Sequence, residues 1–175
     1  MSARTGFALW ITGIPASGKS TIARALADKL QSRGIPAVVL ESDELRRILT
    51  PSATYSPEER SHFYRMMVLI GDLITRSNVN VIFDATANRR SYRDHARSLI
   101  MKFMEVYIQC PLDVCIKRDP KGIYRQAAAG KAATVPGMQT PYEPPVNPDV
   151  TLDGQATPES SSDMILDRLK FRNYI

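Results

Sequence analysis

The sequence predicts a single α/β domain in which a five-stranded parallel sheet lies between two layers of helices. Short apolar runs typical of strands alternate along the chain with apolar residues at helical spacing. A glycine-rich turn joins the first such run to the first helical pattern. The chain has 175 residues, 43% of them hydrophobic, which is enough for one substantial core and not for two. We therefore expect residues 1–175 to form one domain.

The glycine-rich turn is the strongest motif in the chain. The first strand is expected at Phe7 to Thr12, and the first helix carries Ile22, Leu26 and Leu30 on one face. The turn between them, GIPASGKST, fits the phosphate-loop pattern G-x-x-x-x-G-K-[ST]. The alternative, a glycine-serine turn beside a surface lysine, leaves the flanking strand and helix unexplained. The turn is therefore predicted to bind phosphate.

The chemistry of such a loop explains its residue types. Backbone N–H groups and the positive end of the following helix form a cradle for an anion, and glycines allow close approach of the backbone. The Lys19 ammonium is expected on the β- and γ-phosphates of a nucleoside triphosphate, and the Ser20 hydroxyl on Mg²⁺. The residues predicted to hold the nucleotide are consecutive: Gly13, Ile14, Pro15, Ala16, Ser17, Gly18, Lys19, Ser20 and Thr21.

Acidic residues follow the second and third expected strands. Ala37 to Leu40 leads into Glu41 and Asp43, and Val79 to Asp84 ends in an acid. Ligands bind outside the carboxyl ends of parallel strands, so these acids are candidate site residues. Two alternatives stay open: Asp43 as a simple helix cap, and Asp84 as either a structural acid or an acid that holds magnesium.

Two helices are expected around the third strand. The first begins with Ser56 as N-cap and Pro57 at its first position, and the second follows the strand. The first is expected to turn one apolar face to the core, made of Phe63, Met66, Met67, Ile70, Leu73 and Ile74. The second is expected to pack through Ala96, Leu99 and Ile100.

The rest of the chain completes the sheet. Met104 to Gln109 is expected to be a fourth strand and Asp149 to Asp153 a fifth, before a last helix that begins at TPES. Between them, residues 119–148 are rich in glycine, alanine and proline, with one short helix expected around Ile123 to Ala129. A loop this long in a compact domain is usually functional or disordered.

Composition narrows the class of protein. The net charge of +5 favours anionic partners, but no contiguous lysine or arginine block marks a nucleic-acid arm, so small anions are the simpler expectation. No apolar run is long enough to span a membrane, and MSARTGF is no secretory signal, so a cytoplasmic protein without a membrane partner is expected. Cys110 and Cys115 have neither zinc nor redox spacing and are expected to be buried thiols.

The chain resembles the adenylylsulfate kinases. The resemblance rests on LWITGIPASGKST, on PLDVCIKRDPKGIYRQAAAG and on VPGMQTPYEPPVNP, and it runs from about Phe7 to Asp153. It implies a P-loop nucleoside triphosphate hydrolase fold of the adenylate-kinase type, a lid at residues 119–148, and ATP and Mg²⁺ as cofactors. It also implies transfer of the γ-phosphate of ATP to the 3′-hydroxyl of adenylylsulfate, within sulfate assimilation. A homodimer is an open expectation.

The acceptor half of the family pattern is altered in this chain. The stretch D-G-D-N-x-R corresponds to ESDELR, which keeps Asp43 and Arg46. The first adenine-stacking phenylalanine corresponds to Tyr55, and the second to Val135. Losing an aromatic wall gives up much of a base stack worth about 1 to 3 kcal/mol, so adenine need not be the preferred base. The acceptor is therefore expected to be adenylylsulfate first, and another sulfated, phosphorylated or amidated nucleotide second.

The resemblance assigns roles to the matching residues. Lys19 with Lys121 or Arg118 would stabilise the transition state, and Asp43 would orient or deprotonate the acceptor hydroxyl. Asp43 and Asp84 would help Ser20 to hold magnesium. The acceptor is expected to contact Asp43, Arg46, Tyr55, Arg60, Arg65, Thr86, Lys121 and Val135.

Alternatives remain beside each role. Surface ion pairs with Glu58 and Glu59 are the other explanation of the arginines. Asp84 followed by TANRR also resembles 5′-polynucleotide kinases, for which a nucleic-acid end would be the acceptor. A nucleotide-binding regulatory module without turnover is the third class, and the complete phosphate loop argues against it.

Overall fold

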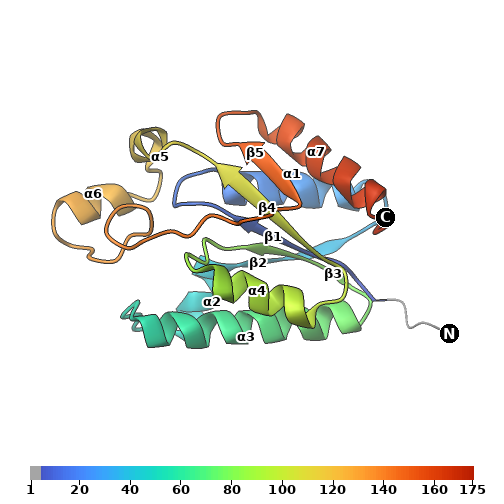
Figure 1. Cartoon of the computed structure of the whole chain (residues 1–175), viewed down its shortest axis with the longest axis horizontal. Coiled ribbons are helices and arrows are strands. Elements are labelled where there is room, and N and C mark those ends of the chain that lie inside the picture. Colours follow the sequence, from blue (N-terminus) through green and yellow to red (C-terminus); the bar gives the residue numbers. More distant parts are fainter. Residues whose placement is uncertain (1–4) are drawn as a thin grey trace.

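The structure, a computed structural model, describes residues 5–175. Residues 1–4, on which part of the prediction about the N-terminal leader rests, lie outside the described residues. All strand pairs are parallel, and the sheet has the order β2-β3-β1-β4-β5 (Figure 1). The strands are β1 (Ala8–Thr12), β2 (Ala37–Glu41), β3 (Asn80–Asp84), β4 (Phe103–Gln109) and β5 (Val150–Asp153). The predicted five-stranded parallel sheet is therefore confirmed.

Helices cover both faces of this sheet, as Figure 1 shows. One face packs against α1 (Lys19–Gln31) and α7 (Pro158–Phe171). The other packs against α3 (Pro57–Arg76) and α4 (Arg90–Leu99). β1 lies between the two cores and is buried over its whole length, which explains why its sequence is a continuous apolar run. Three shorter helices complete the fold: α2 (Ser42–Leu49), α5 (Leu112–Arg118) and α6 (Ile123–Ala128).

The helix starts agree with their sequence signals. The Ser56 hydroxyl accepts a hydrogen bond of 3.2 Å from the Glu59 amide, with Pro57 as the first residue of α3. The Thr157 hydroxyl accepts a bond of the same length from the Ser160 amide at the start of α7. Each cap satisfies one amide that has no partner within its helix, so each fixes where its helix begins.

Three predictions about burial are wrong. Leu73 is 55% exposed and Leu99 is 45% exposed, because the buried stripes of α3 and α4 are turned toward neighbouring positions. In α4 the buried residues are Tyr92, Arg93 and Ala96. Cys110 is only half-buried, whereas Cys115 is buried as predicted, and burial raises the pKa of Cys115 to about 12. Both thiols are free.

The segment of residues 119–148 extends past the carboxyl ends of the strands, on the opposite side of the molecule from the C-terminus (Figure 1). The short helix predicted within it is present as α6. α6 packs through Tyr124 and Ala127 against Cys115 and Val135, in a small core separate from the two beside the sheet. This arrangement places the segment above the edge of the sheet where the acids lie.

Candidate active site

The carboxyl ends of the central strands bring the phosphate loop and the acids together. In the sheet register, Asp84 lies beside Ile11 of β1 on one side and beside Glu41 of β2 on the other. A cavity of about 950 Å³ opens at this edge. Its walls are the phosphate loop, the start of α2, the loop before α3, and residues of the 119–148 segment. We call the part of this cavity lined by the phosphate loop the donor end, and the part lined by Arg46, Tyr55 and Arg60 the acceptor end.

The phosphate loop has the backbone that its glycines predict. A Cβ on Gly13 would lie 2.7 Å from the Ser17 hydroxyl and 2.9 Å from the Ile108 carbonyl oxygen, so only glycine fits there. Gly18 precedes the first residue of α1 with a φ of 104°, a left-handed conformation that favours glycine. The amides at the start of α1 therefore face the cavity without side chains in the way.

Lys19 lies along the loop, with its ammonium donating to the carbonyl oxygens of Gly13 at 3.0 Å and Ile14 at 2.9 Å. Burial lowers the pKa of Lys19, although the nearby charges of Asp84 and Asp43 oppose this effect. A lysine that is poorly solvated and held by neutral carbonyls is ready to exchange them for charged phosphate oxygens.

Asp84 and Ser20 form the part of the site that could hold a metal. Burial raises the pKa of Asp84, against the opposing effects of a hydrogen bond with Ser20 and the charge of Lys19. A carboxylate and a hydroxyl are hard oxygen ligands, and Mg²⁺ commonly takes one or two such groups together with phosphate oxygens and water. Within residues 5–175 no three or more histidine, cysteine or acidic side chains are grouped so that they could hold a metal ion by themselves. The two residues therefore fit Mg²⁺ carried with a nucleotide rather than an all-protein metal cage.

The 119–148 segment reaches the sheet through ion pairs and one tyrosine. The Lys121 ammonium lies 2.5 Å from a carboxylate oxygen of Asp43 and 3.6 Å from one of Glu41. Burial opposes the charge of Lys121, but Asp43 first and Glu41 next outweigh it and raise the pKa of this lysine. The Tyr124 hydroxyl donates to the Pro15 carbonyl at 2.9 Å, which ties the segment to the phosphate loop.

Arg46 stands at the acceptor end as a buried cation that is only partly paired. The residue is 7% exposed, and its guanidinium lies 3.8 Å from the ring centroid of Phe63. Its one acidic contact, Glu59, is 3.4 Å away. Its Nη2 atom is buried and has no hydrogen-bond partner among the residues that the structure describes. A buried, unpaired donor in the wall of a cavity is the feature expected of an anion site.

Arg60 joins the acceptor end to the 119–148 segment. It donates to the Tyr55 carbonyl at 3.0 Å and to the Thr134 carbonyl at 2.8 Å. Two guanidinium groups lie close to the Tyr55 ring, that of Arg46 at 5.0 Å and that of Arg60 at 5.2 Å from the ring centroid. These contacts keep an aromatic side chain at the rim of the cavity, where it could cover a flat ligand.

The structure brings most of the predicted site residues together. Those that line the cavity are Pro15, Ala16, Ser17, Gly18, Lys19, Ser20, Thr21, Asp43, Arg46, Tyr55, Arg60, Asp84, Thr86, Arg118, Lys121 and Val135. Gly13 and Ile14, the first two residues of the loop, do not line the cavity, but their carbonyls hold Lys19. Arg65 is exposed and does not line the cavity, since it is five residues further along α3 than Arg60 and on another face.

Three contributors escaped the sequence analysis. Tyr124 and Thr134 reach the site from the 119–148 segment, and Tyr64 accepts a hydrogen bond of 3.0 Å from the Ala87 amide beside the cavity. No local pattern marks these residues, because their partners are between 23 and 109 positions away in the chain.

None of the helices formed by residues 5–175 is long and apolar enough to cross a membrane.

Comparison with known proteins gives consistent results. The family model described as adenylylsulphate kinase matches residues 5–153. The chain is 36% identical over 171 residues to a probable adenylyl-sulfate kinase of Pyrococcus abyssi, covering 97% of this chain and 98% of that protein. It is 41% identical to an adenylyl-sulfate kinase of Gloeothece citriformis, covering 83% and 82%. The APS kinase of Mycobacterium tuberculosis, solved in complex with AMPPNP and APS, superposes with a TM-score of 0.90 at 32% identity, covering 95% and 98%.

Proposed function

Because the chain belongs to the adenylylsulfate kinase family, we propose that it transfers the γ-phosphate of ATP to the 3′-hydroxyl of adenylylsulfate, giving 3′-phosphoadenylylsulfate. One observation carries this proposal beyond the family resemblance. A single cavity joins a complete phosphate loop to Arg46, a buried cation with an unpaired nitrogen. A donor triphosphate and an anionic acceptor therefore have complementary ends in one groove.

On the donor side, the loop binds the phosphates through backbone amides, and Lys19 moves from its carbonyl partners to the transferring phosphate. Ser20 and Asp84 would hold Mg²⁺, which would supply positive charge to the phosphates. Asp84 binds a cation only in its ionised form, and its raised pKa shows that burial disfavours this form. A cation arriving with the nucleotide removes that cost.

On the acceptor side, Arg46 and Arg60 would bind the charged sulfate-phosphate group, and Tyr55 would cover one face of the base. Asp43 lies at the edge between the two ends and would hold the acceptor hydroxyl in line with the transferring phosphate. Lys121, which bonds to Asp43 at 2.5 Å, would place a second cation near the transferred group. The roles of Thr86 and Val135 as acceptor contacts stay predictions. Arg65, which lies outside the cavity, is given no role in this proposal.

The proposal is tested with a panel of acceptors under ATP and Mg²⁺. Adenylylsulfate, an amidated analogue, AMP and guanylylsulfate would be compared by ADP release above the background without acceptor. We expect the largest kcat/KM with adenylylsulfate. If adenylylsulfate gives no release above background while another nucleotide does, the proposed acceptor is wrong and kinase activity of the family type survives. Steep loss of oligonucleotide binding with salt would instead support a polynucleotide acceptor.

A further inference from the structure

Two segments far apart in the chain meet behind the acceptor end of the cavity. The first, Ala85 to Arg89, is the acceptor turn, which follows β3 and lines the cavity through Thr86. The second, Pro141 to Glu143, is the return arm, the part of the 119–148 segment over which the chain comes back toward β5. Two bonds join these segments directly: Asn88 Nδ2 to the Pro141 carbonyl at 3.1 Å, and the Glu143 amide to the Asn88 carbonyl at 2.8 Å. The amide of Arg90, the first residue of α4, also donates to the Glu143 carboxylate at 2.8 Å.

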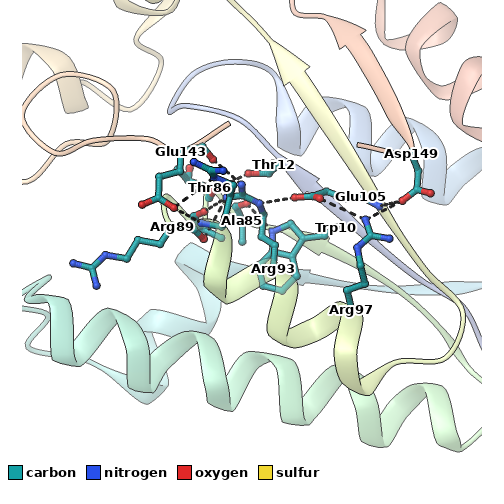
Figure 2. Close-up of polar contacts among 12 residues, drawn as sticks. Trp10, Thr12, Ala85, Thr86, Arg89, Arg93, Arg97, Glu105, Glu143 and Asp149 are labelled. Atoms are coloured by element: carbon teal, nitrogen blue, oxygen red, sulfur yellow. Dashed lines mark hydrogen bonds and ion pairs between the residues drawn. The ribbon is translucent and has the colours of Figure 1, made fainter. Parts of the chain in front are cut away.

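Arg93 of α4 lies between these two segments, as Figure 2 shows. Its guanidinium donates to two carbonyls of the acceptor turn, those of Ala87 and, at 3.4 Å, Arg89. It also donates to the Glu143 carbonyl of the return arm at 2.6 Å. On its other side it forms a 2.6 Å ion pair with Glu105 of β4. One side chain therefore joins the sheet, the turn and the arm.

Arginine has the number and arrangement of hydrogen-bond donors that this position needs, and lysine does not. The Arg93 side chain is fully buried, so its charge is tolerable only because Glu105 pairs with it and carbonyls take its remaining donors. The fork of five N–H groups serves three elements at once, whereas a lysine ammonium is a single point with three donors. Arg93 does not line the cavity, so it acts on a ligand only through the segments that it holds.

Tyr142 supplies a second connection between the arm and the turn. The Thr12 hydroxyl lies 2.6 Å from the Thr86 carbonyl, which can only accept, so Thr12 donates there. Thr12 has one hydroxyl proton, and the Tyr142 hydroxyl at 3.0 Å must therefore be the donor to Thr12. This chain of two bonds runs from the return arm through β1 to Thr86, the residue of the turn that lines the cavity.

We propose that Arg93 is a positioning residue for the acceptor: it holds the acceptor turn and the return arm as one unit, so that Thr86 and the 119–148 segment keep a fixed relation across the cavity. The inference rests on the proposed function for the identity of the acceptor. Stability alone does not explain the arrangement, since a buried ion pair is often no more stabilising than apolar residues of similar volume. The phosphate loop has a separate contact of its own, in which the Tyr124 hydroxyl donates to the Pro15 carbonyl.

The test compares Arg93→Lys with Arg97→Met. Arg97 is a matched control because it lies one turn later on α4 and shares Glu105, at 3.5 Å, but bonds to Asp149 instead of the acceptor turn. We expect Arg93→Lys to raise the KM for adenylylsulfate about tenfold or more, since misplacement by about 1 Å is enough for such a loss. The KM for ATP should stay within about twofold, and Arg97→Met should leave both values within about twofold.

Three results would overturn the proposal: an unchanged acceptor KM in a folded Arg93→Lys protein, an equal rise of both KM values, or the same rise in Arg97→Met. Should Arg93→Lys fail to fold, Tyr142→Phe removes a single hydroxyl and should still raise the acceptor KM at least about threefold, because one hydrogen bond is worth about 1 kcal/mol. An unchanged acceptor KM in that variant would also contradict the proposal.

Amide hydrogen exchange separates this inference from the proposed function. Peptides that cover the acceptor turn and the return arm should both exchange faster in Arg93→Lys than in the wild type, while peptides from β1 stay protected. That readout needs no acceptor. If the wild-type protein does not turn over adenylylsulfate, the proposed function fails while the exchange result still decides on Arg93. Unchanged exchange in both segments would end the positioning role whatever the substrate.

Discussion

Arg46 shows how a single residue can reveal the ligand that a site is built for. Its guanidinium is buried, stacks on Phe63 and lies 3.4 Å from Glu59, and its Nη2 atom has no hydrogen-bond partner among the described residues. The folded protein alone therefore does not satisfy this charged group. An anion bound in the cavity would supply the missing hydrogen bond. Hydrogen bonds to charged groups are worth about 1.5 to 3 kcal/mol, which sets the scale of its contribution.

We expect Arg46→Met to raise the KM for adenylylsulfate by about tenfold to a hundredfold, because that energy is lost from acceptor binding. The KM for ATP should change little, since the phosphate loop lies at the other end of the cavity. Arg65→Met is the matched control, as Arg65 is exposed and outside the cavity. Steady-state kinetics with each substrate varied in turn would measure both. Equal effects of the two substitutions would remove Arg46 from the acceptor site.

Lys19 and Lys121 differ in the pH at which they lose their protons. Burial lowers the pKa of Lys19, so its charge is lost as the pH rises through a value below the ordinary lysine pKa of about 10.4. The pKa of Lys121 is raised, chiefly by Asp43, so its charge persists to higher pH. The alkaline decline of kcat/KM for ATP, which reports the free enzyme, should therefore begin below about pH 10.4.

Arginine substitutions identify the group that causes this decline. Arg stays charged throughout the accessible pH range, so Lys19→Arg should lower the rate but remove the alkaline decline. Lys121→Arg should keep it. A pH profile in which Lys121→Arg removes the decline would show that Lys121, and not Lys19, controls it.

At the level of elements, α3 approaches β3 so closely that one position must be glycine. A Cβ on Gly71 would lie 2.1 Å from the ring of Phe83, far inside van der Waals contact. We expect Gly71→Ala to lower the free energy of unfolding by about 1 to 3 kcal/mol, because α3 must move away from the sheet. Leu73→Ala, on the exposed side of the same helix, should cost no more than about 0.5 kcal/mol.

Urea denaturation of four proteins would measure the Gly71 effect. In a Phe83→Leu background the smaller side chain leaves room, so Gly71→Ala should cost clearly less there than in the wild type. Strict additivity of the two substitutions would contradict the contact as the cause. A large loss of stability in Leu73→Ala would contradict the position of the buried stripe in α3.

The contact between Lys121 and Asp43 allows effects on stability and on catalysis to be measured separately. Both side chains are about half exposed, and such pairs contribute about 0 to 1 kcal/mol to stability. Lys121→Met should therefore leave the free energy of unfolding almost unchanged, yet lower kcat by about a hundredfold or more through lost charge stabilisation. Parallel denaturation and initial-rate measurements would test this. A fall in stability that matches the fall in rate would make Lys121 a structural residue.

The sequence predicted those elements whose signal is local. β1 is a continuous apolar run, and the caps of α3 and α7 are visible at Ser56 and Thr157. α2 escaped prediction because it packs on the core only through the partly buried Leu45 and Leu49, and its one buried residue is Arg46. Leu73 and Leu99 were misplaced because apolar residues also occur beside the buried stripe, and periodicity alone does not say which edge of the stripe is covered.

The candidate site also has a part that local sequence patterns predict and a part that they do not. The phosphate loop and the strand-end acids follow from motif and strand position, and the structure places them around one cavity. The contacts that shape the cavity, Arg60 with Thr134 and Tyr124 with Pro15, join positions 74 and 109 residues apart. Such pairs depend on strand order and on how the 119–148 segment folds back, and neither is encoded in a local pattern.

At the scale of the whole molecule, the residues of the candidate site lie together at one end of the sheet. The C-terminus lies at one end of the sheet and the 119–148 segment at the other, above the carboxyl ends of the strands (Figure 1). The net charge of +5 suits a protein whose groove binds two anions. The single-domain assignment, the cytoplasmic location and the homodimer stay predictions.

The central claim is that one groove transfers phosphate from ATP to the 3′-hydroxyl of adenylylsulfate. The most direct measurement incubates the protein with γ-labelled ATP, Mg²⁺ and adenylylsulfate, then separates the nucleotides and locates the label. We predict label on the 3′ position of phosphoadenylylsulfate, and none in Lys19→Ala, because its ammonium on the transferring phosphate is lost. Label found only in inorganic phosphate, or equal transfer by Lys19→Ala, would contradict the account.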